Sequence, residues 1–140
     1  DYLMLFDTHQ YRRNGDIIPS QLKEMEKHED LYKRIAAMPA EGVAHLGHSE
    51  YKGFGHLLDE AWQLKKKVAP KASTPEIDRI YDAAIEAGAI GGKLLGGGGG
   101  GFILFLVEPD KQELVQRALT DLTYVPFTFE TEGSVILYRD

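Results

Sequence analysis

The chain has 140 residues, which is enough for one domain with a single hydrophobic core, and we predict one domain over residues 1–140. The net charge of −6 argues against general nucleic-acid binding, because that mode needs basic side chains that displace counterions from phosphates. The absence of cysteine excludes disulfides and thiolate metal sites and favours a cytoplasmic protein, and no apolar run reaches the roughly 18 residues of a membrane-spanning helix.

The predicted elements begin with an apolar strand at residues 2–6 and a polar turn at residues 7–16. Because this strand starts almost at the first residue, without an initiator Met, we expect the chain to be part of a longer protein. Apolar side chains at helical spacing, with capping and stop residues at their ends, then predict helical segments at 20–39, 43–47, 49–68 and 74–88. We expect Pro39 to end the first segment, Ser49 to cap the third, and Thr74 with Pro75 to begin the fourth.

The periodicity changes to that of strands after Gly91. Strands at 93–95 and 102–107 flank a run of six glycines, a helix follows Pro109, and two last strands are predicted at 124–129 and 135–138. This order indicates an α+β domain with an antiparallel sheet and helices packed on one face. The split βαβ, or ferredoxin-like, arrangement is a natural candidate.

The glycine run is the strongest functional signal, because nine of the 15 glycines lie between Gly88 and Gly101. Consecutive glycines reach positive φ and expose backbone N–H groups that can surround an anion, so we interpret this loop as a phosphate cradle. A flexible linker, or a loop in which glycine only lets two backbones approach, remains open. A Walker A loop is excluded by Ala87 and Leu94, and a dinucleotide fingerprint by the strand that follows the loop.

The segment AGAIGGKLLGGGGGGFILFLV, residues 87–107, resembles the third motif of the GHMP kinases, the family of galacto-, homoserine, mevalonate and phosphomevalonate kinases. Gly97 stands where alanine is common in that motif. Segments 57–68, 74–84 and 125–138 are similar to one branch, the bacterial D-glycero-D-manno-heptose 7-phosphate kinases. The resemblance implies the C-terminal domain of an ATP-dependent sugar or sugar phosphate kinase, with fucose or galactose as alternative acceptors.

The resemblance also implies the site residues. The loop would supply N–H donors to phosphate or support the ATP-binding loop, through residues Gly96, Gly97, Gly98, Gly99, Gly100 and Gly101. Lys93 would be a cation near the phosphates, with a solvated lysine as the equal alternative, and Thr8 and Arg12 would contact the substrate. The ATP-binding Gly-Leu-Gly-Ser-Ser segment of the family is absent here, so we expect the catalytic residue and the main contacts with ATP and Mg²⁺ in an N-terminal domain, and no activity from this fragment alone.

Other polar and aromatic residues are left outside the predicted site. A metal site at His45, His48 and His56 is disfavoured because no carboxylate completes it at helical spacing. We interpret Trp62 as a core residue, and the lysines at 65–67 as a charged helix end. A stand-alone anion-binding module and a purely structural interaction domain remain the alternatives from other functional classes.

Overall fold

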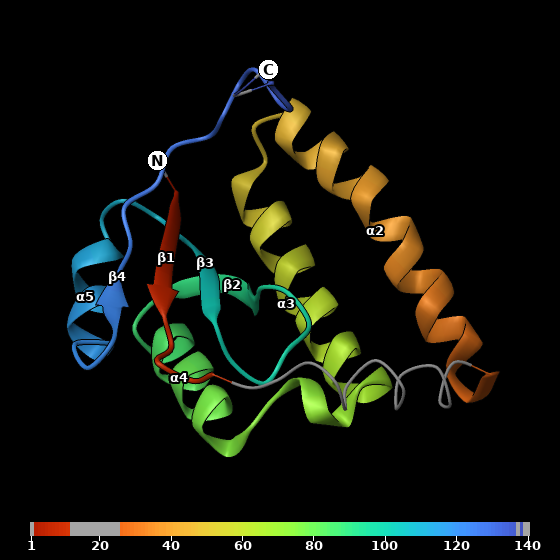
Figure 1. Cartoon of the computed structure of the whole chain (residues 1–140), viewed down its shortest axis with the longest axis horizontal. Coiled ribbons are helices and arrows are strands. Elements are labelled where there is room, and N and C mark those ends of the chain that lie inside the picture. The colour runs from red at the N-terminus through yellow and green to blue at the C-terminus, as the bar shows by residue number, and fades with distance from the viewer. Residues whose placement is uncertain (1, 12–25, 137, 139–140) are drawn as a thin grey trace.

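The computed structural model describes residues 2–11, 26–136 and 138 (Figure 1). Its elements, in chain order and with the labels of Figure 1, are β1 (Leu3–Asp7), η2 (Glu26–His28), α2 (Glu29–Gly47), α3 (Tyr51–Val68), η3 (Pro70–Ala72), α4 (Pro75–Glu86), β2 (Ala89–Leu94), β3 (Phe102–Val107), α5 (Gln112–Ala118) and β4 (Thr123–Tyr124). None of the described helices combines the length and the apolar character that crossing a bilayer would require.

The four strands form one antiparallel sheet in the order β2-β3-β1-β4. β1 pairs with β3 along its whole length, from Leu3 opposite Leu106 to Asp7 opposite Phe102. With helices between β1 and β2 and another between β3 and β4, this order is the split βαβ arrangement. The predicted α+β fold class is therefore confirmed.

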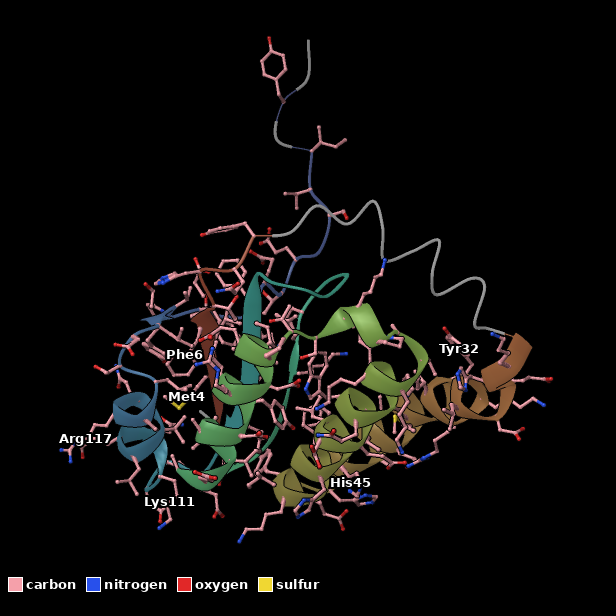
Figure 2. The ribbon with its side chains drawn as sticks, turned by 90° about the horizontal axis from the view of Figure 1, so that it is seen from below. Met4, Phe6, Tyr32, His45, Lys111 and Arg117 are labelled. Carbon is pink, nitrogen blue, oxygen red and sulfur yellow. The ribbon has the colours of Figure 1, made fainter. Side chains whose placement is uncertain are left out.

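The main core lies between the sheet and helices α4 and α5. Alternate residues of β3 point into it, as the period of a strand requires, and Trp62 is fully buried, which confirms its prediction as a core residue. Figure 2 shows Met4 and Phe6 of β1 within this core. The predicted start of α4 is also confirmed, because the Thr74 hydroxyl accepts a hydrogen bond from the Ile77 N–H at 3.2 Å.

Helix α3 lies directly on the edge strand β2, and α2 packs on α3 (Figure 1). The contact between α3 and β2 is so close that a Cβ atom added to Gly91 would lie 2.0 Å from the carbonyl oxygen of Gly55. Glycine at both positions lets the helix backbone touch the strand backbone. This contact places the end of α3 beside the glycine loop that follows β2.

The expected break at Pro39 is wrong, because α2 continues through this residue to Gly47 and absorbs the separate segment predicted at 43–47. Proline removes one helical hydrogen bond, but contacts with α3 hold both sides of it. Arg34 donates to Glu41 from one side of the proline to the other, at 2.9 Å from Nη2, and to Glu60 of α3 at 2.7 Å from Nε. The first part of the predicted helix, 20–25, lies outside the described residues.

Ser49 does not cap α3 as expected. The helix begins at Tyr51 after Glu50, and no side chain makes the cap hydrogen bond. Ser49 instead has a φ of +58°, which turns the chain between α2 and α3. The end of that helix at Val68 agrees with the predicted boundary.

The two C-terminal strands predicted at 124–129 and 135–138 are also wrong for the described residues. Only Thr123–Tyr124 pairs with β1, and Val125 makes the last bond, from its N–H to the Leu5 carbonyl at 2.8 Å. Pro126 has no N–H and ends the ladder. Among the described residues beyond it, large apolar side chains are exposed, as the 76% exposure of Phe129 and the 70% exposure of Ile136 show.

Candidate functional site

The glycine loop has a defined backbone conformation. Five of its six glycines have positive φ angles, and Gly97 is the exception. Two of them approach another part of the chain so closely that no side chain fits. A Cβ atom at Gly98 would lie 2.7 Å from the Cα of Ala72, and one at Gly100 would lie 2.1 Å from the carbonyl oxygen of Gln10. Close backbone approach, one of the interpretations left open by the sequence, therefore holds at these two positions.

Hydrogen bonds fasten this loop to three parts of the chain. The Gly99 N–H donates to the Ala72 carbonyl of η3 at 2.7 Å, and the Gly101 N–H donates to the Gln10 carbonyl at 2.8 Å. The Gly101 carbonyl accepts from Thr8, at 2.9 Å from the N–H and 2.6 Å from the hydroxyl. From α3, the Lys65 ammonium donates to the Gly96 carbonyl at 2.7 Å.

These bonds leave several loop N–H groups free. In the part of the chain that the structure describes, no hydrogen-bond acceptor is found for the N–H groups of Gly96, Gly97, Gly98 and Gly100. Successive backbone N–H groups held in a turn are good donors to an anion, since they need no rearrangement to bind it. The loop is therefore a candidate anion-binding element.

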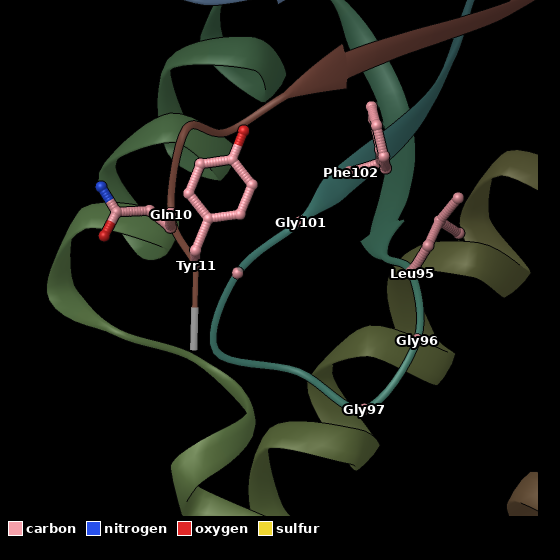
Figure 3. A pocket seen from close by; sticks show the side chains of 8 residues that line it. Gln10, Tyr11, Leu95, Gly96, Gly97, Gly101 and Phe102 are labelled. Atoms are coloured by element: carbon pink, nitrogen blue, oxygen red, sulfur yellow. The ribbon is translucent and has the colours of Figure 1, made fainter. Parts of the chain in front are cut away.

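An open hollow of about 330 Å³ lies beside the loop, and its lining consists of Gln10, Tyr11, Leu95, Gly96, Gly97, Gly100, Gly101 and Phe102. Figure 3 shows the Tyr11 ring on one side of it, and Leu95 and Phe102 on the other. The Tyr11 hydroxyl donates to a carboxylate oxygen of Asp7 at 3.2 Å, and this bond raises the pKa of Tyr11. The hollow is thus bordered by loop glycines along one wall and by aromatic and aliphatic surface along the others.

The predicted site residues reach this region to different degrees. Thr8 is buried, with 2% of its surface exposed, and its hydroxyl accepts from the Gln10 N–H at 3.3 Å while donating to the loop. Lys93 lies elsewhere, in a second hollow between α2 and α3 that it shares with Leu58 and Ala61. Arg12 lies outside the described residues. The structure therefore brings Thr8 to the loop as a support, and places Lys93 on the α3 side of β2.

Sequence reasoning missed Lys65, which it treated as part of a charged helix end. The side chain is half-buried against the loop, and burial lowers its pKa, with a further lowering from the positive charge of Lys93. A signal for it was present in the sequence. Lys65 comes seven residues after Leu58 and four after Ala61, so it lies on the same face of the helix as these two. Lys67 does not share this spacing.

The family model for the C-terminal domain of GHMP kinases matches residues 41–124. The D-glycero-alpha-D-manno-heptose 7-phosphate kinase of Campylobacter jejuni is 36% identical over 87 residues, which cover 61% of this chain and 26% of that protein. The chain thus spans about a quarter of the length of this curated relative.

The solved structures that resemble this chain include two kinases. The mevalonate kinase of Methanococcus jannaschii matches with a TM-score of 0.71 at 27% identity, over 88% of this chain and 37% of that chain. The galactokinase of Lactococcus lactis, solved with galactose, matches with a TM-score of 0.63 at 14% identity, over 88% of this chain and 44% of that chain, which shows a shared fold. Since the family model covers more than half of its residues, the chain belongs to the GHMP kinases, as their C-terminal domain.

Proposed function

We propose that this chain is the C-terminal domain of an ATP-dependent kinase that phosphorylates a hydroxyl of a sugar phosphate, D-glycero-D-manno-heptose 7-phosphate. The γ-phosphoryl group of ATP would pass to the sugar hydroxyl and leave ADP. The observation that supports the proposal is the fastened glycine loop, which keeps free N–H groups and lines an open hollow through Gly96, Gly97, Gly100 and Gly101. The 36% identity to a heptose 7-phosphate kinase supports this choice of acceptor over other sugars.

The role of the loop in this reaction follows from its geometry. Phosphoryl transfer depends mainly on positioning the two substrates and neutralising the phosphate charge. The free donors of Gly96, Gly97, Gly98 and Gly100 would hold phosphate oxygens, and Thr8 would keep the loop in place through the Gly101 carbonyl. Lys93 and Arg12 stay candidates for contacts with phosphate and with substrate.

The groups that bind Mg²⁺ are proposed to come from the rest of the enzyme. Among the described residues, no three His, Cys, Asp or Glu side chains are grouped so that they could hold a metal ion. Mg²⁺ is bound by oxygen ligands, above all carboxylates and the phosphates of the nucleotide. We therefore assign the phosphate-facing N–H donors to this chain, and the carboxylate ligands and the catalytic residue to the N-terminal domain.

A coupled assay of ADP release by the full-length parent enzyme tests the proposal. The highest kcat/KM is expected with heptose 7-phosphate in a panel of sugars and sugar phosphates, while these 140 residues alone release no ADP. Preferential turnover of fucose or galactose would mean that this sugar, and not heptose 7-phosphate, is the acceptor. No ADP release with any acceptor would refute the kinase function.

A further inference from the structure

Tyr11 is 84% exposed, and yet hydrogen bonds fix the position of its ring. The Tyr11 hydroxyl donates to one carboxylate oxygen of Asp7 at 3.2 Å, and the other oxygen accepts from the His9 N–H at 2.9 Å. Directly before Tyr11, the Gln10 carbonyl accepts from the Gly101 N–H of the loop at 2.8 Å. A ring that is held at its backbone and at its tip loses little conformational freedom when a ligand covers it.

Phe102 and Leu95 form the opposite wall of the hollow (Figure 3). Phe102 of β3 lies opposite Asp7 of β1 in the sheet, and the Leu95 N–H donates to the Phe102 carbonyl at 2.8 Å. Because residues directly opposite each other in antiparallel strands point to the same face, these three side chains share one face of the sheet. It is the face turned away from the main core, which takes the next residue, Ile103. The strand register therefore sets the Tyr11 ring, through Asp7, across the hollow from two exposed apolar side chains.

The chemistry of these walls suits the ring of a sugar. None of the described residues that line the hollow carries a charge, and its volume of about 330 Å³ is at the lower end of the range of small-molecule sites. The face of an aromatic ring is weakly negative and attracts the polarised C–H groups of a sugar, whose hydroxyls point outward at the ring edge. In a sugar phosphate and in ATP alike, the group nearest to the phosphates is a sugar, and adenine lies beyond the ribose. A phosphate at the glycine loop would therefore bring a sugar ring, and not a base, to the hollow.

We propose that Tyr11, Phe102 and Leu95 hold the sugar ring of a phosphorylated substrate, with Tyr11 as the stacking surface. Asp7 is a positioning residue, because it bonds to the Tyr11 hydroxyl and does not line the hollow. The inference rests on the proposed function, which supplies the phosphate at the loop. The sugar is either the heptose of the acceptor or the ribose of ATP, and substrate kinetics distinguish the two.

Ligand-observed NMR of the full-length parent enzyme tests the stacking. Heptose 7-phosphate and ATP are titrated separately, and the sugar C–H protons of one of them should move upfield in the ring current of Tyr11. In Tyr11→Ala the upfield shift should vanish and the affinity should fall by about tenfold, as expected for one lost aromatic contact. Tyr11→Phe keeps the ring but not the bond to Asp7, so its affinity should lie between those of the wild type and Tyr11→Ala. If Tyr11→Ala does not fold, Tyr11→Leu, which keeps an apolar side chain without the ring, decides.

Tyr138→Ala is the matched control, because Tyr138 is 80% exposed and is not among the residues that line the hollow. Its upfield shift and affinity should equal those of the wild type. An equal loss of affinity in Tyr138→Ala and Tyr11→Ala would overturn the proposal. A wild-type enzyme in which neither sugar shows an upfield shift would overturn it as well.

Steady-state kinetics of the parent enzyme identify the source of the sugar. A raised KM for heptose 7-phosphate in Tyr11→Ala assigns the hollow to the acceptor, and a raised KM for ATP assigns it to the ribose. An active Tyr11→Ala enzyme with both KM values unchanged would contradict the inference while leaving the kinase function intact. A parent enzyme that binds heptose 7-phosphate through Tyr11 but releases no ADP would instead refute the kinase function alone.

Discussion

Alanine at Gly98 should destabilise the chain much more than alanine at Gly101. The two glycines have similar φ angles, +108° and +99°, so alanine has a similar conformational cost at both, about 1–2 kcal/mol. They differ in space, because a Cβ atom at Gly98 would lie 2.7 Å from the backbone of Ala72, whereas one at Gly101 has nothing within 4 Å. Relieving this clash adds about 1–3 kcal/mol at Gly98 alone. We therefore expect losses of about 2–5 and about 1–2 kcal/mol in the free energy of unfolding.

Urea unfolding of the two variants and the wild type, followed by circular dichroism, measures this difference. The urea concentration at the unfolding midpoint should be lower for Gly98→Ala than for Gly101→Ala. The slope of the unfolding free energy against urea concentration should be the same in all three proteins. The close contact between Gly98 and Ala72 of η3 is the feature that should separate the two variants, because a Cβ atom at Gly101 meets no other atom within 4 Å. Equal midpoints for the two variants would refute the argument that this contact requires glycine.

Two further predictions concern the supports of the loop and of the helices. Thr8→Val removes the hydroxyl that donates to the Gly101 carbonyl at 2.6 Å, so the free energy of unfolding should fall by about 1–2 kcal/mol and the Gly101 amide hydrogen should exchange faster. Thr8→Ser keeps the hydroxyl and should keep the stability. Equal stability of the two variants would contradict this prediction. Hydrogen bonds from Arg34 lower the pKa of Glu41 and Glu60 below the ordinary 4.5, so the stability they add is complete above that pH and is lost as the pH falls through the lowered values. As the pH is lowered, the melting temperature of Arg34→Met should fall less than that of the wild type. Arg117→Met, which removes an exposed ion pair with Glu113, is the control and should behave as the wild type does. An equal fall in melting temperature in all three proteins would refute the assignment.

The sequence predicted best those features that depend on neighbouring residues. The cap of α4 depends only on Thr74 and Pro75, and the loop was evident from its glycines. Pro39 was misjudged because Arg34 bonds across it to Glu41 and is itself held by Glu60 of α3, which lies far along the chain. The strands expected after Tyr124 follow a good alternating pattern, but a strand needs a neighbouring edge, and the described residues supply none beyond β1.

The same limit explains what was missed in the candidate site. Lys65 is one of three consecutive lysines, and their composition alone gives no reason to separate them. Only the packing of α3 on β2 turns one of the three toward Gly96, another toward Asp78, and leaves Lys67 exposed. Tyr11 likewise joins the hollow through the path of the chain after β1.

The backbone contact between Gly55 and Gly91 has a mechanical consequence. Helix α3 has 18 residues and is about 27 Å long, at about 1.5 Å per residue, and it is held against β2 near its first turn while Lys65 reaches the loop from its last. The helix is also fixed near its last turn, because Trp62 is fully buried in the main core and Lys66 pairs with Asp78 of α4. Lys65 therefore reaches the Gly96 carbonyl from a helix that is held at both ends, so that the start of the glycine loop has a rigid support.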